Sequence, residues 1–397
     1  MPFLFLQKAY QKDIEPLLEG ENLSVVMNAA IPGLSEVILK EQTFTQVFLT
    51  ESLLSASLIT EVRLQDVIMT NPVKIYDEYK GKNFILSAAN PNLPGSQLDV
   101  TNVIYRMEAR KPINRNAEEY RLQATHNTLL TNQQKRIHKM YTKMTPTAIV
   151  QDALGIVESN NNNTESTDPI RDYVAKNVHP YEVIYDQANY ALASGNDPSL
   201  LHFMTYENLG THYFRSIKTL TKQPTIAKYT YEDKGAGYHL THTYNIMSYE
   251  FPCEFDLLSD IMNGVNAPVT SISVNPIKSL WNSSTNSLGG NLSGSTFTNK
   301  GTEDHSATTK FEEAQRYRAA RLALLRPDRI SLRITVPFNP NLHAGKMIHT
   351  KFPSSFGLDE FGTGDYLIVS MTHNLRLSGY GVTVLDLVSR TVGDGIV

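Results

Sequence analysis

Cysteine is almost absent from this sequence of 397 residues, in which Cys253 stands alone. A single thiol excludes an intramolecular disulfide framework, a multi-cysteine zinc ribbon and an iron–sulfur centre. The adjacent acid, Glu254, disfavours the thiolate form of Cys253. We therefore predict that Cys253 is a structural thiol and not a nucleophile.

Long hydrophobic runs are also missing. The longest apolar stretches are a few residues, whereas a helix needs ~20 apolar residues to cross a bilayer. The start of the chain, Met1–Leu6, is apolar but has neither the basic region nor the small-residue cleavage site of a signal peptide. The sequence therefore predicts no membrane insertion, and a chain made in a reducing cytoplasm.

An excess of positive charge is lacking as well. The chain has 36 Lys and Arg against 40 Asp and Glu, which gives a net charge of -4. A general nucleic-acid binder is disfavoured, because affinity for phosphate rests on clustered basic residues. The length corresponds to roughly two to three domains of ~150 residues, enough to build cores without disulfides or metals.

Recognisable catalytic motifs are absent. The sequence contains neither the Gly-x-Ser-x-Gly elbow of hydrolases nor the His-Glu-x-x-His motif of zinc proteases. His239 and His242 lie in a segment typical of a strand, which would place them on opposite faces and disfavours a metal site. The Gly289–Ser295 stretch lacks the Gly-Lys-Ser/Thr ending of a phosphate-binding loop.

Two charged features are interpreted as surface. Adjacent acids, Glu118-Glu119 and Glu312-Glu313, diverge in direction and are predicted to be surface charges. The basic stretch Lys135–Lys143 could contact phosphate, but a solvated helix or strand edge is the more common outcome. The sequence thus predicts no catalytic residue, no cofactor and no metal site, and a protein that is not an enzyme.

Alternating hydrophobicity dominates the first third of the chain. Residues 101–110 and 119–124 place apolar side chains on one side and polar ones on the other, which predicts half-buried antiparallel strands. Further strands are expected at 23–28, 35–40, 43–50 and 58–68. Many short strands at this spacing favour a barrel or a sandwich.

The periodicity changes to helical after about residue 138. Thr145 and Pro146 are typical of a helix start, and an apolar stripe follows up to Val157. The polar tract 159–167 offers little to bury, a second helix is expected after Pro180, and strands are expected at 200–206 and 212–217. This is a small α/β segment between two β-rich ones.

The last third returns to strands after a long interruption. Residues 282–309 are rich in Ser, Thr, Asn and Gly, and cannot offset their ordering entropy by burial. A helix is expected over 311–326, ended by Pro327. Strands are expected at 330–336, 365–374 and 381–390, the last two joined through Ser378-Gly379.

The order of these parts is more informative than any single motif. The segments that carry it are Tyr120–Leu154 with the helix start Thr145-Pro146-Thr147-Ala148, Pro180–Leu220 with Glu207-Asn208-Leu209-Gly210, and Ile330–Val388 with Asn339-Pro340-Asn341-Leu342 and Gly364-Asp365-Tyr366-Leu367. In order and spacing they resemble the central baseplate hub proteins of contractile-tailed bacteriophages, a family related to the hub portion of type VI secretion spikes. The resemblance spans residues from about 100 to 390, and the insert at 282–326 departs from it.

The resemblance implies a mainly β fold with an α/β insert. Two tube-type β-barrel domains are expected at 1–137 and 236–397, with a small α/β middle domain at 138–235 between them. The second barrel would carry the insert 282–326. Hubs of this family form a trimeric ring, so that six alike domains match a hexameric tail tube while the trimer matches the cell-puncturing spike.

The implied partners follow from that role. They are further copies of the chain in a homotrimer, the trimeric spike protein, the hexameric tail tube protein, baseplate wedge proteins and the tape measure protein. The resemblance places the protein in the virion, at the tail baseplate, with DNA only in transit through the channel. We expect a polar lumen that is not strongly basic, because a basic wall would trap DNA during ejection.

Two other classes stay open. A carbohydrate- or cell-surface-binding β-protein of a phage tail would use the 20 tyrosines for stacking, although the single tryptophan, Trp281, argues against it. A cell-wall hydrolase is less favoured, because it would require two converging carboxylates.

Overall fold

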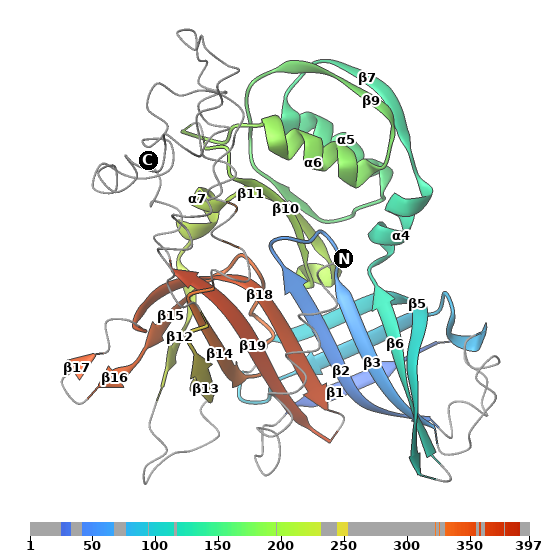
Figure 1. Ribbon diagram of the computed structural model, residues 1–397, viewed down its shortest axis with the longest axis vertical. Helices are drawn as coiled ribbons and strands as arrows, with labels where there is room; N and C mark the ends of the chain where they lie inside the picture. Colours follow the sequence, from blue (N-terminus) through green and yellow to red (C-terminus); the bar gives the residue numbers. More distant parts are fainter. Residues whose placement is uncertain are drawn as a thin grey trace, which may run out of the picture.

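The computed structural model describes residues 25–32, 42–66, 77–93, 95–114, 117–195, 197–231, 244–252, 322, 325, 330–354, 357–358, 362–376 and 378–389. In this part of the chain fifteen strands join into one hydrogen-bonded sheet, which curls into two rings. An α/β module projects from their junction (Figure 1). The prediction of a mainly β fold with α/β content is confirmed.

The first β-ring is built from the N-terminal strands. These are β1 (Val26–Ala30), β2 (Gln42–Ser52), β3 (Ile59–Asp66), β4 (Asn83–Ala89), β5 (Gln97–Asn114) and β6 (Ala117–Thr125). They pair in the order β1-β4-β5-β6-β3-β2, and β2 then pairs with β18 (Gly364–Arg376) near the end of the chain. The Val25 amide donates to the carbonyl of Gly379, just after β18, over 2.8 Å. That bond brings the last strand beside the first and closes the ring.

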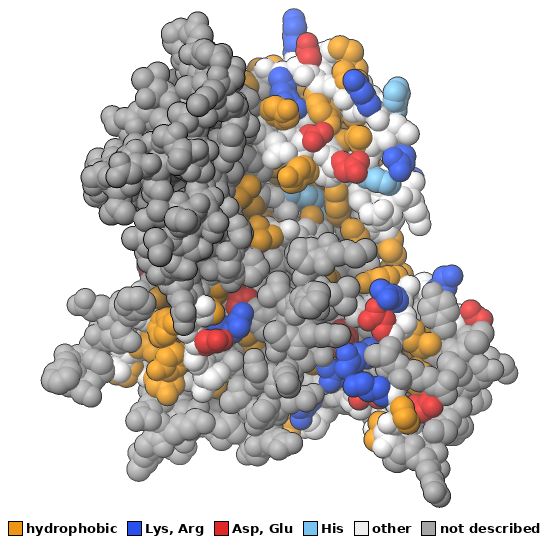
Figure 2. Space-filling model, in the orientation of Figure 1, with side chains coloured by type: hydrophobic (Ala, Val, Ile, Leu, Met, Phe, Trp, Pro, Cys, Tyr) orange, Lys and Arg blue, Asp and Glu red, His pale blue; other side chains and the backbone are white. Residues whose placement is uncertain are grey.

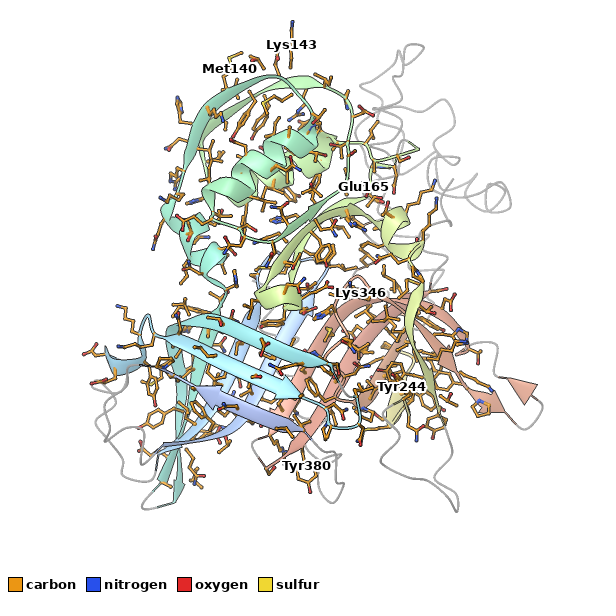
Figure 3. The ribbon with its side chains drawn as sticks, turned by 180° about the vertical axis from the view of Figure 1, so that it is seen from behind. Met140, Lys143, Glu165, Tyr244, Lys346 and Tyr380 are labelled. Carbon is orange, nitrogen blue, oxygen red and sulfur yellow. The ribbon has the colours of Figure 1, made fainter. Side chains whose placement is uncertain are left out.

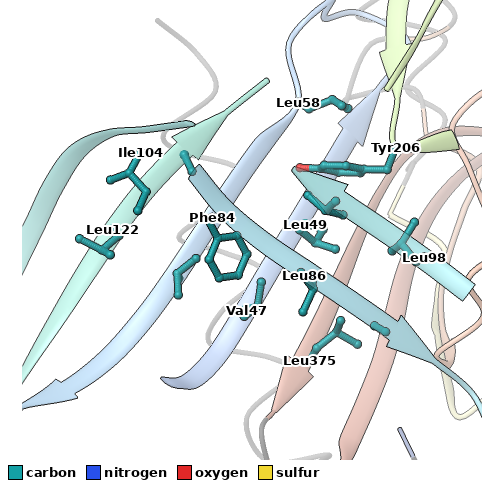
Figure 4. Packing of buried hydrophobic residues seen from close by; sticks show 14 of the residues in the cluster. Val47, Leu49, Leu58, Phe84, Leu86, Leu98, Ile104, Leu122, Tyr206 and Leu375 are labelled. Atoms are coloured by element: carbon teal, nitrogen blue, oxygen red, sulfur yellow. The ribbon is translucent and has the colours of Figure 1, made fainter. Parts of the chain in front are cut away.

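The core of the first ring follows from the alternation in its strands. Val47 and Leu49 of β2, Phe84 of β4 and Leu122 of β6 all point inward, where they meet Leu375 of β18 (Figure 4). Burying each such side chain contributes about 1.5–3 kcal/mol. The strands expected at 43–50, 58–68, 101–110 and 119–124 are confirmed as β2, β3, β5 and β6. β1 begins and ends later than the expected 23–28, and the strand expected at 35–40 lies outside the described residues.

The α/β module follows the first ring in sequence. Its elements are α4 (Asn127–Gln134), β7 (Ile137–Met144), α5 (Pro146–Ile156), β8 (Asn162–Thr164), β9 (Arg171–Val178), α6 (Pro180–Tyr190), β10 (Leu200–Thr205), the 3-10 turn η2 (Glu207–Leu209), β11 (Thr211–Ser216) and α7 (Ile217–Thr221). Both predicted helices are confirmed. α5 begins as expected at Thr145, whose side chain accepts a hydrogen bond from the Ala148 amide.

The sequence did not predict the β7–β9 ribbon as a pair. Most of the basic stretch 135–143 lies in β7, which pairs with β9 and covers α5 and α6 (Figure 1). The polar tract 159–167 is also more ordered than its composition suggests. β8 pairs with β11, and Glu165 accepts hydrogen bonds from the Ser216 amide and the Thr219 hydroxyl. Polar contacts, not apolar burial, fix this tract.

The second β-ring contains the C-terminal strands. They are β12 (Thr225–Thr230), β13 (Ser248–Glu250), β14 (Leu332–Pro337), β15 (Met347–Lys351), β18 and β19 (Tyr380–Ser389), with the small hairpin β16 (Pro353–Ser354) and β17 (Gly357–Leu358) beside them. The pairing runs β12-β15-β18-β19-β14-β13. The amide of Thr230 donates to Tyr244 and the Ile246 amide donates back to Thr230, which closes this ring. The strands expected at 330–336, 365–374 and 381–390 are confirmed.

One strand belongs to both rings. The first residues of β18, Gly364–Leu367, pair with β15, whereas Ser370–Arg376 pair along the same edge with β2. The register of β18 against β19 shifts between Ile368 and Ser370, where the two partners change over. Such a bulge bends a strand and increases its twist. β18 therefore fixes the two rings relative to each other.

One expectation about charge is wrong. Glu118 is not a surface charge, because only 6% of it is exposed and it accepts a hydrogen bond from the Tyr120 hydroxyl over 2.7 Å. Other expectations fall outside the described residues: Cys253, Trp281, His239, His242, Gly289–Ser295, Glu312-Glu313 and nearly all of the helix expected over 311–326.

Candidate functional site: the junction of the rings and the module

A buried carboxylate lies where the two rings and the module meet. Glu51, near the end of β2, is 0% exposed. Its Oε1 accepts from the Tyr206 amide (2.7 Å) and from His343 Nδ1 (3.0 Å), and its Oε2 accepts from the Ala344 amide (2.7 Å). A buried carboxylate is tolerated only when such donors satisfy it. One side chain of the first ring therefore holds the module and a loop of the second ring together.

Tyr206 extends this junction into the core of the first ring, where its ring packs beside Leu98 and Leu58 (Figure 4). Its hydroxyl donates to the carbonyl of Ile59 over 2.9 Å and accepts from the Thr60 hydroxyl over 2.9 Å. Burial raises the pKa of Tyr206 far above its usual range, so the phenol stays neutral.

An ion pair closes the outer side of the junction. Lys346 Nζ lies 3.1 Å and 3.2 Å from the two carboxylate oxygens of Glu207, which also accepts from the Tyr213 hydroxyl. Burial acts to raise the pKa of Glu207, but the Tyr213 hydrogen bond and the Lys346 charge together lower it. Lys346 thus ties the second ring to the turn η2 of the module (Figure 3).

A pocket of about 400 Å³ opens beside this ion pair. Segments of β5, η2, β12 and the loop before β15 line it. Several of its polar side chains have partners: Glu207 binds Lys346, Asp99 accepts from Gln97 over 2.7 Å, and His343 contacts Glu51. The pocket is therefore a gap between elements that these contacts join.

Three histidines, His126, His202 and His212, belong to a chain of hydrogen bonds within the module that ends at the turn η2. Thr128, on α4, donates its amide proton to Nδ1 of His126 over 3.3 Å, so this ring nitrogen carries no proton of its own. The Thr128 hydroxyl, 2.9 Å from the same nitrogen, must then donate to it as well. The sulfur of Met204 lies 3.8 Å from this hydroxyl and is a weaker acceptor.

Because the Thr128 hydroxyl donates to His126, the donor and acceptor of each remaining hydrogen bond in the cluster are fixed. The Thr128 oxygen accepts from the Tyr181 hydroxyl (3.1 Å) and from Nε2 of His212 (3.1 Å). Nδ1 of His212 is consequently free of a proton and accepts from Nε2 of His202 over 3.2 Å. At the other end His126 hydrogen-bonds the backbone of Leu209 in η2. The chain runs from His202 to η2 with every ring neutral.

The surroundings keep these rings neutral. Burial lowers the pKa of His202 to about 3, and lowers that of His126. The pKa of His212 lies well below its usual range, because of burial and the two neighbouring histidines. Tyr181 packs edge-on against both His202 and His212, at centroid distances of 5.1 Å and 5.8 Å. Acid would place charge into this packed cluster.

The junction has the chemistry of a structural joint. Within the described residues no group of three or more His, Cys, Asp or Glu side chains is placed to hold a metal ion. In the same part of the chain, no helix has the length and apolar character needed to span a bilayer. The nitrogens that face each other in the histidine cluster are used by the hydrogen-bond chain, and both oxygens of Glu51 are used by donors.

Comparison with known proteins supplies a fold. No protein-family model and no curated protein matches the chain. Among solved structures, the 43 kDa tail protein of prophage MuSo2 from Shewanella oneidensis aligns with a TM-score of 0.54 and 11% identity, covering 94% of this chain and 99% of that one. A tail protein from Neisseria meningitidis MC58 gives 0.53 and 10%, covering 93% and 98%. The chain has the fold of phage tail proteins.

A third structure extends this likeness beyond phages. A type VI secretion component of Escherichia coli, which is structurally similar to the bacteriophage T4 tail proteins gp27 and gp5, aligns with a TM-score of 0.50 and 10% identity. The alignment covers 91% of this chain and 76% of that one. The resemblance seen in the sequence is thus matched at the level of fold, including its link to type VI secretion.

Sequence reasoning did not single out the residues that join this tail-protein fold. Glu51 carried a usable signal, because alternation in β2 places it on the same face as Val47, Leu49 and Leu53, which are all buried. A carboxylate on an apolar strand face predicts a buried polar contact. The histidine cluster had no such signal, because His126, the N-cap of α4, is about 80 residues away in sequence from the neighbouring strands β10 and β11 that carry His202 and His212.

Proposed function

We propose that this chain is the central hub of a contractile phage tail baseplate, a structural protein that forms a trimeric ring and is not an enzyme. The observation that carries the proposal is the pair of β-rings in one chain, joined by a shared strand, together with the likeness in fold to tail proteins. The buried contacts at Glu51 and β18 support it, because they hold the two rings rigidly side by side.

Two rings in each chain would let a trimer act as a symmetry adapter. Three chains would place six β-rings around one axis, which suits a hexameric tail tube on one face. The threefold symmetry of the same assembly suits a trimeric spike on the other. A rigid joint between the rings would be needed, since a hinge there would disturb the sixfold arrangement.

The proposal includes the finer points of the expected role. The barrel domains would lie near 1–137 and 236–397 and the α/β domain near 138–235, except that α4 lies in the module and β12 in the second ring. The partners would be the spike, the tail tube, wedge proteins and the tape measure protein. DNA would cross a polar channel along the axis, and the hub would belong to the virion.

Native mass spectrometry of the purified 44.5 kDa chain tests this proposal. A complex of three chains, imaged by electron microscopy as a ring with a central hole, is the expected result. Because a hub can require its spike to assemble, the measurement is repeated with the spike protein co-expressed. A monomer in both preparations, together with retention on a polysaccharide column, would contradict the hub and favour the carbohydrate-binding reading.

A further inference from the structure

The β7–β9 ribbon carries a charge opposite to that of the whole chain. Residues 135–144 and 171–178 contain one acid, Asp172, whereas the chain as a whole has a net charge of -4. Against that single acid stand six basic residues, namely Lys135, Arg136, Lys139, Lys143, Arg171 and Lys176. Figure 2 shows basic and hydrophobic side chains, with some acidic ones among them, on the module at the top of the molecule. The ribbon is thus a local basic surface.

The outer face of the ribbon has an apolar centre. Its inner face is occupied, because Ile137, Tyr141 and Ala175 pack on the helices of the module. On the outer face Met140 and Val174 are direct cross-strand partners, 61% and 46% exposed. Single exposed apolar residues are ordinary on a protein surface, but an adjacent pair within a basic rim is typical of an interface.

Lys143 is held outward by an unusual backbone. The register between β7 and β9 shifts between Tyr141 and Met144, and Lys143 has a φ of 50°. Its amide donates to Asp172 over 2.7 Å, which fixes the bulge. Figure 3 shows Lys143 and Met140 at the outermost end of the module, with Lys143 pointing away from it. Bulges of this kind often re-aim a side chain at a functional surface.

The side chains of Lys143 and Lys176 can pair with carboxylates of another molecule. Within the described residues Lys143 and Lys176 form no ion pair, whereas Lys139 lies 3.0 Å from Asp152 and 4.7 Å above the Tyr141 ring. β7 and β9 pair only with each other in that part of the chain, so each leaves one backbone edge open. Lysines also protect edges from unwanted pairing. Edge protection alone would not place exposed Met140 and Val174 between them.

We propose that the β7–β9 ribbon is a docking surface for an acidic, extended segment of a partner protein. The apolar side chains of the partner segment would cover Met140 and Val174, and the carboxylates of that segment would pair with Lys143 and Lys176. Open strand edges suit such a segment, because main-chain hydrogen bonds add to the side-chain contacts. The proposal does not depend on the trimer, since it concerns a surface on the module of one chain.

A short acidic peptide tests the surface directly. The probe is a fluorescent heptapeptide, Glu-Val-Glu-Val-Glu-Leu-Glu, titrated with the full chain, and its charge-reversed form with Lys in place of Glu is the control. We expect the acidic peptide to bind and the basic one not to. Binding should weaken at least ~tenfold between about 50 mM and about 300 mM salt, because the contacts are exposed ion pairs.

Two sets of variants locate the site. K143E/K176E should weaken binding of the acidic peptide about tenfold or more, and Met140→Ser should weaken it several-fold. The control K222E/K228E makes the same change of charge at two exposed lysines in and just before β12. It should leave the affinity for the acidic peptide within about twofold.

Circular dichroism and unfolding midpoints must match across the set, so that a fold defect is not mistaken for lost binding. The proposal is overturned if both peptides bind equally, or if K143E/K176E behaves like K222E/K228E. It is also overturned if duplex DNA of about 20 base pairs binds to the same lysines while Met140→Ser has no effect, because the surface would then be a phosphate site.

Discussion

Lowering the pH from about 7 to about 5 should destabilise the folded chain through its buried histidines. His373 in β18 is the clearest case. It is 0% exposed, its Nδ1 lies 2.7 Å from the Thr383 hydroxyl, and its ring packs 5.0 Å from that of Phe338. Burial, with a smaller effect of His343, lowers the pKa of His373 to about 3.

The sign follows from proton uptake. With a folded pKa below the unfolded value of about 6.5, the unfolded chain binds more protons in acid. The contribution of the neutral His373 ring to the free energy of unfolding is therefore complete above about pH 6.5, and it declines as the pH falls towards 3. At about pH 5 the difference from the unfolded pKa is ~1.5 pH units, which corresponds to about 2 kcal/mol for His373.

The histidine chain adds to this loss. His202, whose pKa burial also lowers to about 3, should contribute up to a similar amount, because protonation would place a charge in the packed cluster. A total of about 3–4 kcal/mol is a large part of the 5–15 kcal/mol that stabilises typical domains. Free Asp and Glu have ordinary pKa values near 4, so histidines dominate proton uptake by the unfolded chain between about pH 7 and about pH 5.

Urea unfolding at several pH values measures the effect. H373Q lowers stability at every pH, but its free energy of unfolding should fall about 2 kcal/mol less between pH ~7 and ~5 than that of the unchanged chain. H138Q, at an exposed position of β7, should keep the full pH dependence. Equal losses in the unchanged chain and H373Q would refute the reasoning.

Two further changes test the junction. E51Q should lower the free energy of unfolding by about 3 kcal/mol, because the NH2 group of the new amide would face a buried donor that now binds the carboxylate. The control Glu250→Gln breaks only an exposed ion pair and should cost at most ~1 kcal/mol. Urea unfolding of both variants measures the two losses. G210A should cost ~2 kcal/mol or more, because Gly210 has a φ of 115° and a Cβ there would lie 2.8 Å from Nε2 of His126. G81A, with a φ of 74° and no atom within 4 Å, should cost only ~1 kcal/mol; thermal unfolding of both variants checks the ranking.

Local pattern was enough for about half of the described elements, whereas strands such as β4, β12 and β15 were not predicted. The alternation at 101–110 and 119–124 predicts β5 and β6, and the Thr145-Pro146 start predicts α5, because strand faces and helix caps depend on neighbours in sequence. The order of these elements also carried the resemblance to tail hubs. None of this required knowledge of which strand lies beside which.

Only the tertiary structure decided how the parts are joined. Nothing in residues 364–376 indicates that β18 has two partners along one edge, because the choice depends on strands that are distant in the chain. Glu51 finds its partners 155 and 292 residues later. The basic stretch 135–143 became an interface candidate only when β9 supplied Val174 and Lys176 across from it. The sequence pattern determines which face of an element is apolar, because that depends on near neighbours in the chain. Which other element covers that face depends on contacts between residues that are far apart in sequence.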